Sequence, residues 1–399
     1  LGALARAHLT RWREHSGGTV LALTGSAGKT TTKWALASLL ETLAPGEVYA
    51  SPGNLNNQIG VPLCALCVGP EHRYAVFELG TNCPGEIAAL GRIVKPDVAL
   101  LTLVAAAHTE GLGNIEAVAK EKGALFEQLL AHENAVAIGN GDDARVSELV
   151  RGSAAPSKLL YGSGADHDYQ IVSRKLSSHD RTQLTLKRPD GSEVHVELPI
   201  IGMAGALAGV AALAGVEALV GSACSDEALT RALSAGGVQG RLASEKLRGG
   251  VVLIDDSYNA NPASCEASLL AASEVRQLTG GRLLLVLGEM RELGGVSVEA
   301  HATLGEQVAK EEAELLIAVG GDARHTADAA AAAGASARFV ENAEAAAREL
   351  LDSVRDGDVV LVKGSRGVRT ERAAEALRSR GAPFNAPPAG GAKCAGVTV

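Results

Sequence analysis

Short apolar runs alternate with helical patterns along the first 150 residues of the chain. The run TVLAL at 19–23 leads into a glycine-rich turn, and a helical pattern follows at 30–43. Further strand-like runs lie at 74–79, 97–104 and 134–138, with a helical stretch at 115–130 among them. Strands that alternate with helices form parallel sheets covered on both faces. This part of the chain therefore predicts an α/β fold on a mostly parallel sheet.

The pattern changes after residue 150, where three short segments alternate apolar and polar residues. They lie at 168–173, 182–187 and 193–198, with the turn Pro189-Asp190-Gly191 between the last two. Alternation with a period of two is typical of strands with one buried face, and this turn favours a hairpin. We therefore expect a small antiparallel sheet, followed by two alanine-rich helices at about 203–220 and 226–235.

The third part of the chain returns to strands that alternate with helices. Its apolar runs lie at 251–254, 282–287, 315–319, 337–340 and 358–362. This order predicts a second α/β domain, doubly wound and Rossmann-like. The glycines at 236, 237 and 240 mark a hinge before it, so we place a domain boundary near residue 240.

Four segments follow from these patterns. Residues 1–15 look like an amphipathic helix entered partway through a longer protein, and we interpret them as the remnant of an N-terminal segment. We assign 16–240 to a central domain and 241–381 to the Rossmann-like domain. The remaining residues, 382–399, have the composition of a linker, and we expect a disordered tail.

Composition and charge indicate a folded cytoplasmic protein. Of 399 residues, 46% are apolar and 21% are charged, a balance typical of globular domains. The net charge of −9 gives no general attraction to nucleic acid or anionic lipid. The uncharged stretch 198–216 approaches the length of a membrane span, but it is rich in Ala and Gly and includes Pro199, so we interpret it as a buried helix. We expect a monomer that binds no nucleic acid and does not span a membrane.

The six cysteines are scattered along the chain without the density of a disulfide scaffold, which favours a reducing cytoplasm. Cys64 and Cys67 form a CxxC pair, but no second pair has the spacing of a zinc site and the flanking residues are apolar. We therefore expect both thiols to be buried and free of metal.

The sequence LTGSAGKTTT at 23–32 comes directly after the first predicted strand and before a helix. Glycines allow a backbone to approach phosphate groups, and a helix N-terminus directs amides at them. Lys29 supplies a positive charge for the terminal phosphate, and Thr30 supplies a hydroxyl for Mg²⁺. The loop is a shortened TGxxGKT form, because Leu23 stands where a full GxxxxGK[ST] loop has glycine. We predict that the nucleotide is held by Gly25, Ser26, Ala27, Gly28, Lys29, Thr30 and Thr31.

Several further motifs occur in the order found in one enzyme family. They are GNLNNQIGVPL at 53–63, ELGTNCPGEI at 78–87, AAAHTEGLG at 105–113, DDSYNANP at 255–262, LGEMRELG at 287–294 and VKGSRGVRTE at 362–371. With these motifs, residues 15–380 resemble the Mur ligases, and among them those that join D-alanyl-D-alanine to UDP-N-acetylmuramoyl-tripeptide in peptidoglycan precursor synthesis. The resemblance implies a ligase that uses ATP and Mg²⁺ and forms its amide through an acyl phosphate. It also implies a P-loop central ATPase domain followed by a Rossmann-like C-terminal domain.

The resemblance further implies which residues handle the metal and the phosphates. It assigns Lys29, Glu78, His108 and Lys122 to catalysis, and Thr30, Glu78, His108 and Lys122 to Mg²⁺. Glu78 follows a predicted strand at the carboxyl edge of the sheet, where open α/β sheets bind ligands, and a carboxylate there suits Mg²⁺. Lys122 is implied to carry a carbamate, which converts a cation into an acid-like metal ligand.

Other residues are implied to bind the nucleotide and the two substrates. Arg241, at the hinge, and Asp256, at the end of a predicted strand, are implied to contact the nucleotide. The amino substrate is assigned to Tyr258, Asn259, Asn261, Lys363, Ser365 and Arg366, and the acceptor to Asn54, Asn56 and Asn57. Without the resemblance, DDSYNANP is also typical of a polar turn and 363–366 of a helix start, and both interpretations stay open.

Two features depart from the family pattern. Ala204, Gly205 and Ala208 stand where the family usually has a His-Asn pair and then an Asn that contacts adenine. The N-terminal UDP-binding domain of the family has no counterpart here, since about eighteen residues precede the first predicted strand. Two alternatives therefore stay open. One is another Mur-type amino-acid ligase, which should lack DDSYNANP and LGEMRELG, and the other is a truncated nucleotide-binding relic without full activity.

Overall fold

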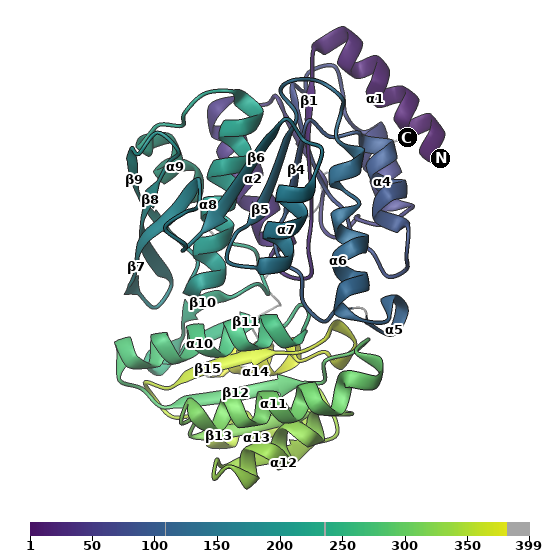
Figure 1. Ribbon diagram of the computed structural model, residues 1–399. Helices are drawn as coiled ribbons and strands as arrows, with labels where there is room; N and C mark the ends of the chain where they lie inside the picture. Colours follow the sequence, from purple (N-terminus) through teal and green to yellow (C-terminus); the bar gives the residue numbers. More distant parts are fainter. Residues whose placement is uncertain (108, 235–236, 381–399) are drawn as a thin grey trace.

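The computed structural model describes residues 1–107, 109–234 and 237–380. Within these ranges the chain forms two sheets, one of nine strands and one of six, which lie in an upper and a lower lobe in Figure 1. His108, Gly236 of the expected hinge and the expected disordered tail at 382–399 lie outside the described residues. The domain boundary near residue 240 stays a prediction. The last described helix of the upper lobe ends at Leu233, and the first strand of the lower lobe begins at Ala243.

The upper lobe carries helices on both faces of its sheet (Figure 1). Its strands are β1 (Thr19–Thr24), β2 (Val48–Ala50), β3 (Tyr74–Glu78), β4 (Val98–Leu101), β5 (Val136–Asn140), β6 (Ser157–Gly162), β7 (Tyr169–Ser178), β8 (Arg181–Lys187) and β9 (Glu193–Leu198). Its helices are α1 (Gly2–Ser16), α2 (Lys29–Leu43), α3 (Gly60–Leu66), α4 (Glu86–Val94), α5 (Thr109–Leu112), α6 (Ile115–Gly123), α7 (Ala144–Gly152), α8 (Gly202–Val220) and α9 (Asp226–Leu233).

The upper sheet has the order β2-β3-β1-β4-β5-β6-β7-β8-β9. β1 lies at the parallel centre, where Leu23 is opposite Glu78 of β3 and Leu100 of β4. The carboxyl ends of these three strands therefore meet at one edge. The expected antiparallel strands are present as β7, β8 and β9, and they continue the main sheet because β6 pairs with β7 in parallel from Tyr161 and Tyr169 onward.

The prediction of a single helix at 115–130 is wrong for the second half of that range. α6 ends at Gly123, and one turn of 3₁₀ helix follows at Phe126–Gln128. Gly123 lies against α7, where a Cβ would come within 2.6 Å of a methyl carbon of Leu149. Hydrophobic periodicity does not register such a tertiary contact, so the sequence pattern missed the break.

The lower lobe is doubly wound, as the sequence predicts. Its strands are β10 (Ala243–Lys246), β11 (Val252–Asp256), β12 (Leu283–Gly288), β13 (Leu315–Val319), β14 (Ala337–Val340) and β15 (Val359–Lys363). Its helices are α10 (Pro262–Thr279), α11 (Ser297–Lys310), α12 (Ala323–Ala332), α13 (Ala343–Ser353) and α14 (Glu371–Ser379). The order is β10-β11-β15-β12-β13-β14, and all pairs are parallel except β10 with β11.

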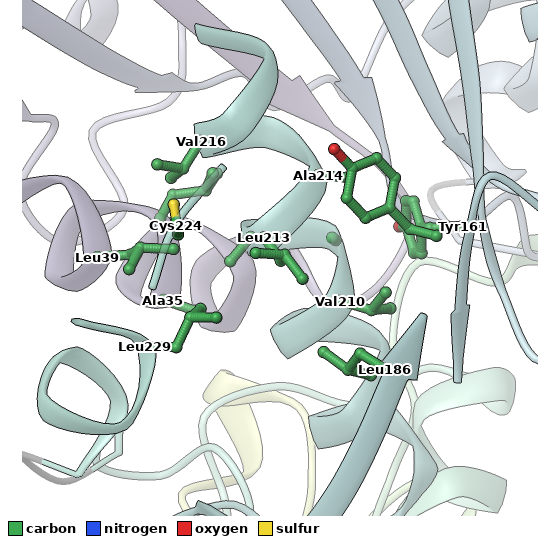
Figure 2. Packing of buried hydrophobic residues seen from close by; sticks show 14 of the residues in the cluster. Ala35, Leu39, Tyr161, Leu186, Val210, Leu213, Ala214, Val216, Cys224 and Leu229 are labelled. Carbon is green, nitrogen blue, oxygen red and sulfur yellow. The ribbon is translucent and has the colours of Figure 1, made fainter. Parts of the chain in front are cut away.

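Helix α8 runs through the core of the upper lobe. Figure 2 shows Val210 and Leu213 of this helix among Leu39 of α2, Tyr161 of β6 and Leu186 of β8. The helix is long and apolar enough to cross a bilayer, but 67% of its most apolar stretch is buried inside the protein. In the described structure it is therefore a core helix, and its glycines let it approach α2 and the sheet closely.

The CxxC pair is only half buried. Cys64 lies in α3 and is buried, whereas Cys67 follows the end of α3 and is exposed. The expectation of two buried thiols is therefore wrong for Cys67, because the chain leaves the core where the helix ends. Among the residues that the structure describes, no three His, Cys, Asp or Glu side chains cluster in the manner of a ready metal site.

A buried ionic network holds the antiparallel strands against α8. Nε of Arg188 donates to Oε1 of Glu217 at 2.9 Å, and its Nη2 donates to the Cys224 carbonyl. The Tyr169 hydroxyl donates to the other oxygen of Glu217 at 2.9 Å. The two charged side chains are only 9% and 7% exposed, so each depends on the other for compensation.

Replacing Glu217 by alanine should lower the free energy of unfolding by about 3 kcal/mol, because Arg188 would remain as an unpaired buried charge. Urea denaturation followed by circular dichroism measures the change. Glu227→Ala is the control, since it removes a pair with Arg231 whose side chains are 67% and 81% exposed. That loss should cost less than about 0.5 kcal/mol. Equal effects of the two substitutions would contradict the assigned role of the buried pair.

Candidate active site

The phosphate loop predicted from the sequence joins β1 to α2 at the carboxyl edge of the upper sheet. Gly25 has φ 153° and packs against the residues that follow β4, where a Cβ would come within 1.9 Å of Oγ1 of Thr102. Gly28 has φ 82° and precedes the first residue of α2. The loop therefore needs glycine at both positions, at the first because of a close approach and at the second because of a left-handed backbone.

The N-terminus of α2 presents its amides without a competing acid. Gly28 provides no side-chain cap, and the first turn contains no acidic residue. Lys29 lies in this turn, and its Nζ donates to the Gly25 carbonyl at 2.7 Å, so the ammonium group folds back over the loop. Desolvation lowers the pKa of Lys29, with Glu78 opposing and Arg241 adding to the shift. Such a terminus suits an anion with several oxygens, such as a polyphosphate.

Glu78 ends β3 beside this loop, and its side chain is almost fully buried. Asn56 donates from Nδ2 to Oε1 of Glu78 at 2.9 Å, and Thr30 donates to the same oxygen at 3.4 Å. Nζ of Lys33 lies 3.0 Å from Oε2. Burial alone would raise the pKa of Glu78, but the ammonium groups of Lys33 and Lys29 outweigh it and hold the pKa below its usual value.

The residues present fit Mg²⁺. Oε2 of Glu78 is buried and lies 3.0 Å from Nζ of Lys33 without an aligned hydrogen bond, and a carboxylate oxygen has a second lone pair that a cation can use. Thr30 lies within 3.4 Å of the same carboxylate and offers a hydroxyl oxygen. A carboxylate and a hydroxyl beside a phosphate cradle are the ligands that Mg²⁺ takes in such sites. His108, the other predicted ligand, lies outside the described residues.

Lys122 is buried in α6, with 1% of its surface exposed. Burial and the charge of Lys29 lower its pKa well below the ordinary lysine value, and Glu121 only partly opposes them. Glu121 itself accepts amide hydrogen bonds from Gly85 at 2.6 Å and Ile87 at 2.8 Å, which fixes α6 against the start of α4. A lysine in this position holds an unusually large share of neutral amine, the form that can react with carbon dioxide.

The sequence analysis missed Lys33. It lies one helical turn after Lys29, so both side chains project from the same side of α2. Its Nζ donates to the Gly53 carbonyl at 2.7 Å as well as pairing with Glu78, and it is buried. The spacing of two lysines four residues apart in a helix that begins at a phosphate loop could have indicated it.

The asparagines predicted to meet the acceptor have three different surroundings. Asn56 binds Glu78, as described, and its carbonyl accepts from the amide of Gly80. Asn57 is exposed, and its Oδ1 accepts from the amides that open α3. Asn54 is exposed beside them. The loop that carries all three is tied to the carboxylate by Asn56 and, through Gly53, by Lys33.

From the lower lobe, Arg241 reaches the phosphate loop. Its Nη2 donates to Oγ1 of Thr30 at 3.3 Å, and its guanidinium lies 4.1 Å from the ring centroid of Tyr258. Nε of Arg241 is buried and has no hydrogen-bond partner. A positioned guanidinium with an unused donor beside a phosphate loop fits an oxygen of an anionic ligand.

Asp256 is occupied by contacts within its own lobe. Its Oδ1 accepts from the amide of Leu242 at 3.1 Å, and its Oδ2 accepts from Nζ of Lys363 at 2.5 Å and from Ser268 at 2.6 Å. Leu242 has φ 50°, a left-handed conformation that is uncommon outside glycine. The carboxylate therefore fixes the backbone next to Arg241, and its predicted contact with the nucleotide stays a prediction.

The three residues predicted to bind the dipeptide carboxylate differ in access. Lys363 is 2% exposed and is held by Asp256. Ser365 is 4% exposed, and its Oγ accepts from the amide of Arg291 at 2.9 Å. Arg366 has 69% of its side chain exposed and lies 5.7 Å from the ring of Tyr258. Only the guanidinium of Arg366 is open to a ligand in this arrangement.

Two asparagines of the DDSYNANP motif are placed differently. Asn259 is exposed, and its carbonyl accepts from Lys363 at 3.1 Å. Asn261 caps α10 and also donates to the Ser26 carbonyl of the phosphate loop at 3.1 Å. The structure therefore brings the phosphate loop, Glu78, Arg241 and Asn261 together. Lys363 and Ser365 lie inside the lower lobe.

The small residues that replace the family's His and Asn side chains at the start of α8 are in closely packed positions. A Cβ on Gly205 would lie 2.5 Å from Cγ2 of Ile200, so a larger residue would require Ile200 to move. Ala208 is buried, and Ala204 packs against the core of the lower lobe. These positions therefore contribute close contacts, and they offer no side-chain hydrogen bond.

Comparisons with known proteins agree with this geometry. The family model of the Mur ligase middle domain matches residues 23–216, and that of the Mur ligase glutamate ligase domain matches residues 240–366. The UDP-N-acetylmuramoyl-tripeptide--D-alanyl-D-alanine ligase of Escherichia coli is 36% identical over 384 residues, which cover 95% of this chain and 81% of that protein. The ligase of the same name from Bacillus subtilis is 32% identical, and the match covers 93% of this chain and 77% of that protein.

Solved structures give the same result. MurF from Acinetobacter baumannii superposes with a TM-score of 0.82 at 30% identity, over 94% of this chain and 80% of that one. The MurF ligase from Thermotoga maritima in complex with ADP superposes with a TM-score of 0.80 at 29% identity, over 94% and 83% of the two chains. The chain therefore belongs to the Mur ligase family, close to its MurF members.

Proposed function

We propose that the chain is an ATP-dependent ligase that joins D-alanyl-D-alanine to UDP-N-acetylmuramoyl-tripeptide, in peptidoglycan precursor synthesis. The observation that carries the proposal is the meeting of the phosphate loop, the buried carboxylate of Glu78 and, from the other lobe, Arg241 at Thr30. Identity of 36% and 32% with ligases of this substrate pair supports the choice of substrates.

The first step is phosphoryl transfer from ATP to the terminal carboxylate of the acceptor peptide, which gives an acyl phosphate and ADP. Lys29 and the amides of α2 hold the phosphates, and Arg241 adds positive charge from the other side. Mg²⁺, held by Glu78 and Thr30 with phosphate oxygens, would neutralise charge on the transferring group. We propose His108 and the carbamate of Lys122 as further metal ligands.

The second step is attack of the dipeptide amine on the activated carbonyl carbon. A tetrahedral oxyanion forms and collapses, the new amide bond remains, and phosphate leaves. Arg366 is exposed beside Tyr258 and is placed to hold the dipeptide carboxylate. Asn259, Asn54 and Asn57 are exposed, and we assign the first to the dipeptide and the other two to the acceptor. Contact between the lobes excludes water, which would otherwise hydrolyse the acyl phosphate.

We also propose the organisation that accompanies this activity. Residues 16–240 form a central ATP-binding domain, and residues 241–381 form a C-terminal domain that carries Arg241 and Arg366. We propose a cytoplasmic monomer that binds no nucleic acid and does not span a membrane; within the described residues, the one helix long and apolar enough to span is mostly buried.

Lys29→Ala should abolish the activity, with a loss of at least about a hundredfold in rate, because the ammonium group stabilises charge on the transferred phosphate. The assay measures phosphate release with ATP, Mg²⁺ and both substrates, omits each in turn, and checks the product mass. Lys310→Ala, on the exposed face of α11, is the control and should keep full activity. Release by the unaltered chain that does not need both substrates would contradict the proposed function.

Lys122 should carry a carbamate. Burial lowers the pKa of Lys122 well below the ordinary lysine value, which raises the share of neutral amine, and a neutral amine adds carbon dioxide with loss of a proton. With ¹³C-labelled bicarbonate, the unaltered protein should show a carbamate carbon resonance that Lys122→Met lacks. Lys120→Met, on the same helix, should retain it. A resonance unaffected by Lys122→Met would assign the label to another site.

Lys33→Met should shift the acid limb of the pH profile of kcat/KM to higher pH. Lys33 helps to hold the pKa of Glu78 low, so its removal raises that pKa, and the carboxylate is lost at a higher pH. We expect kcat/KM near pH 7 to fall about tenfold, which is the usual scale for one charged contact. Lys33→Arg keeps the charge and should shift the limb less. An unmoved limb in Lys33→Met would exclude this coupling.

A further inference from the structure

Asn261 is the N-cap of α10, and this role fixes the orientation of its amide. Oδ1 accepts from the amide of Ser264 at 2.9 Å, and the backbone amide of Asn261 donates to Oγ of Ser264 at 3.1 Å. This reciprocal pair is a capping box, and Pro262 at the first helical position stiffens the entry further. Because the oxygen is committed to the helix, the NH₂ group must point away from α10.

The NH₂ group of Asn261 donates across to the upper lobe. Its Nδ2 lies 3.1 Å from the carbonyl oxygen of Ser26 in the phosphate loop. Capping requires only an acceptor oxygen, and aspartate or serine would supply one. The donor is the property that distinguishes asparagine here, and within the described part of the chain it meets the Ser26 carbonyl of the loop.

Ser26 is a rigid point of contact. Its amide donates to the Leu103 carbonyl at 2.7 Å, and its hydroxyl lies 3.0 Å from both the carbonyl and the amide of Ala105. The segment after β4 then leads to Thr109, whose hydroxyl donates to the Leu293 carbonyl of the lower lobe at 2.9 Å. Contacts between the lobes therefore lie on both sides of the phosphate loop.

Helix α10 is also fixed to the upper lobe further along its length. At Gly202, which opens α8, a Cβ would come within 2.7 Å of Cβ of Ala271. Glu274 makes a bidentate pair with Arg174 of β7, at 2.7 and 2.5 Å. Asn261 and Glu274 are separated by about 20 Å along the helix axis. The helix therefore has one anchor at the sheet and another at the phosphate loop.

We propose that Asn261 is a positioning residue that fixes the position of the lower lobe relative to the phosphate loop. Its amide sets the distance between the start of α10 and Ser26, and so it sets the position from which Arg241 meets Thr30. The resemblance to the family implies a contact with the amino substrate for this residue, and the proposed role is different. The rate measurements below rest on the proposed ligase function, whereas the scattering and nucleotide-binding measurements do not.

The test compares Asn261→Asp with Ser264→Ala. Aspartate keeps the acceptor for the Ser264 amide and suits a helix N-terminus, but it offers no donor and places negative charge against the Ser26 carbonyl. Ser264→Ala removes the reciprocal side chain of the capping box and leaves the bond to Ser26 in place. The first substitution should therefore act on the contact between the lobes, and the second should act on helix stability.

For Asn261→Asp we expect a larger radius of gyration in small-angle X-ray scattering with ADP and Mg²⁺ present. We expect kcat to fall about tenfold, the scale of one lost hydrogen bond with added repulsion. The dissociation constant of ADP should change less than about twofold, because the phosphate loop itself is unchanged. Ser264→Ala should lower Tm but leave the radius of gyration and kcat near those of the unaltered protein.

Two results would overturn the proposal. One is an Asn261→Asp protein with unchanged scattering and unchanged kcat, which would leave Asn261 as a helix cap alone. The other is a rise in the KM for D-alanyl-D-alanine with kcat unchanged, which would place Asn261 in the substrate site instead. If the unaltered protein releases no phosphate with its substrates, the ligase function fails, and the scattering comparison still decides the role of Asn261.

Discussion

The buried carboxylate of Glu78 is the charge on which the arrangement of the active site depends. A carboxylate this deep costs several kcal/mol unless cations compensate it. Lys33 and Lys29 supply that compensation from one side of α2, and Asn56 ties the loop that carries Asn54, Asn56 and Asn57 to the same carboxylate. Because all of these groups converge on one strand end, the phosphate loop, the asparagine loop at 54–57 and Glu78 form a single unit. A change in any one of them alters the charge balance of the others.

The lower lobe uses most of its polar groups to hold its own strand ends. Asp256 and Lys363 form a buried pair at the adjoining ends of β11 and β15, and the pair fixes the backbone of Leu242 in a left-handed conformation. This rigid edge then presents Arg241 and Asn261 to the upper lobe. Asp256 and Lys363, which look like ligands in the sequence, pair with each other in this structure, and Arg241 and Asn261 contact the phosphate loop.

Most of the fold could be predicted because buried strands leave a clear apolar signal. The ranges 193–198, 315–319 and 337–340 agree with β9, β13 and β14 at both ends. The joining of β7 to β6 and the break of α6 at Gly123 could not be predicted, since both depend on contacts between distant segments. The same limit applies to the site. The loop at 23–32 has a local signature, whereas the pairing of Lys33 with Glu78 appears only when α2 and β3 are side by side.

The start of α8 shows how packing constrains recognition. Gly202 lies against Ala271 of α10, and Gly205 lies against Ile200, so small residues are required where the helix meets both lobes. An asparagine at 205 would therefore require Ile200 to move. Because Ala204, Gly205 and Ala208 carry no side-chain donor or acceptor, we expect the base of the nucleotide to be held by other groups. Under the proposed assignment, the phosphate loop and Arg241 supply most of the affinity for the nucleotide, and both groups recognise phosphate in any nucleotide. We therefore expect the chain to discriminate only weakly between nucleotides that carry different bases.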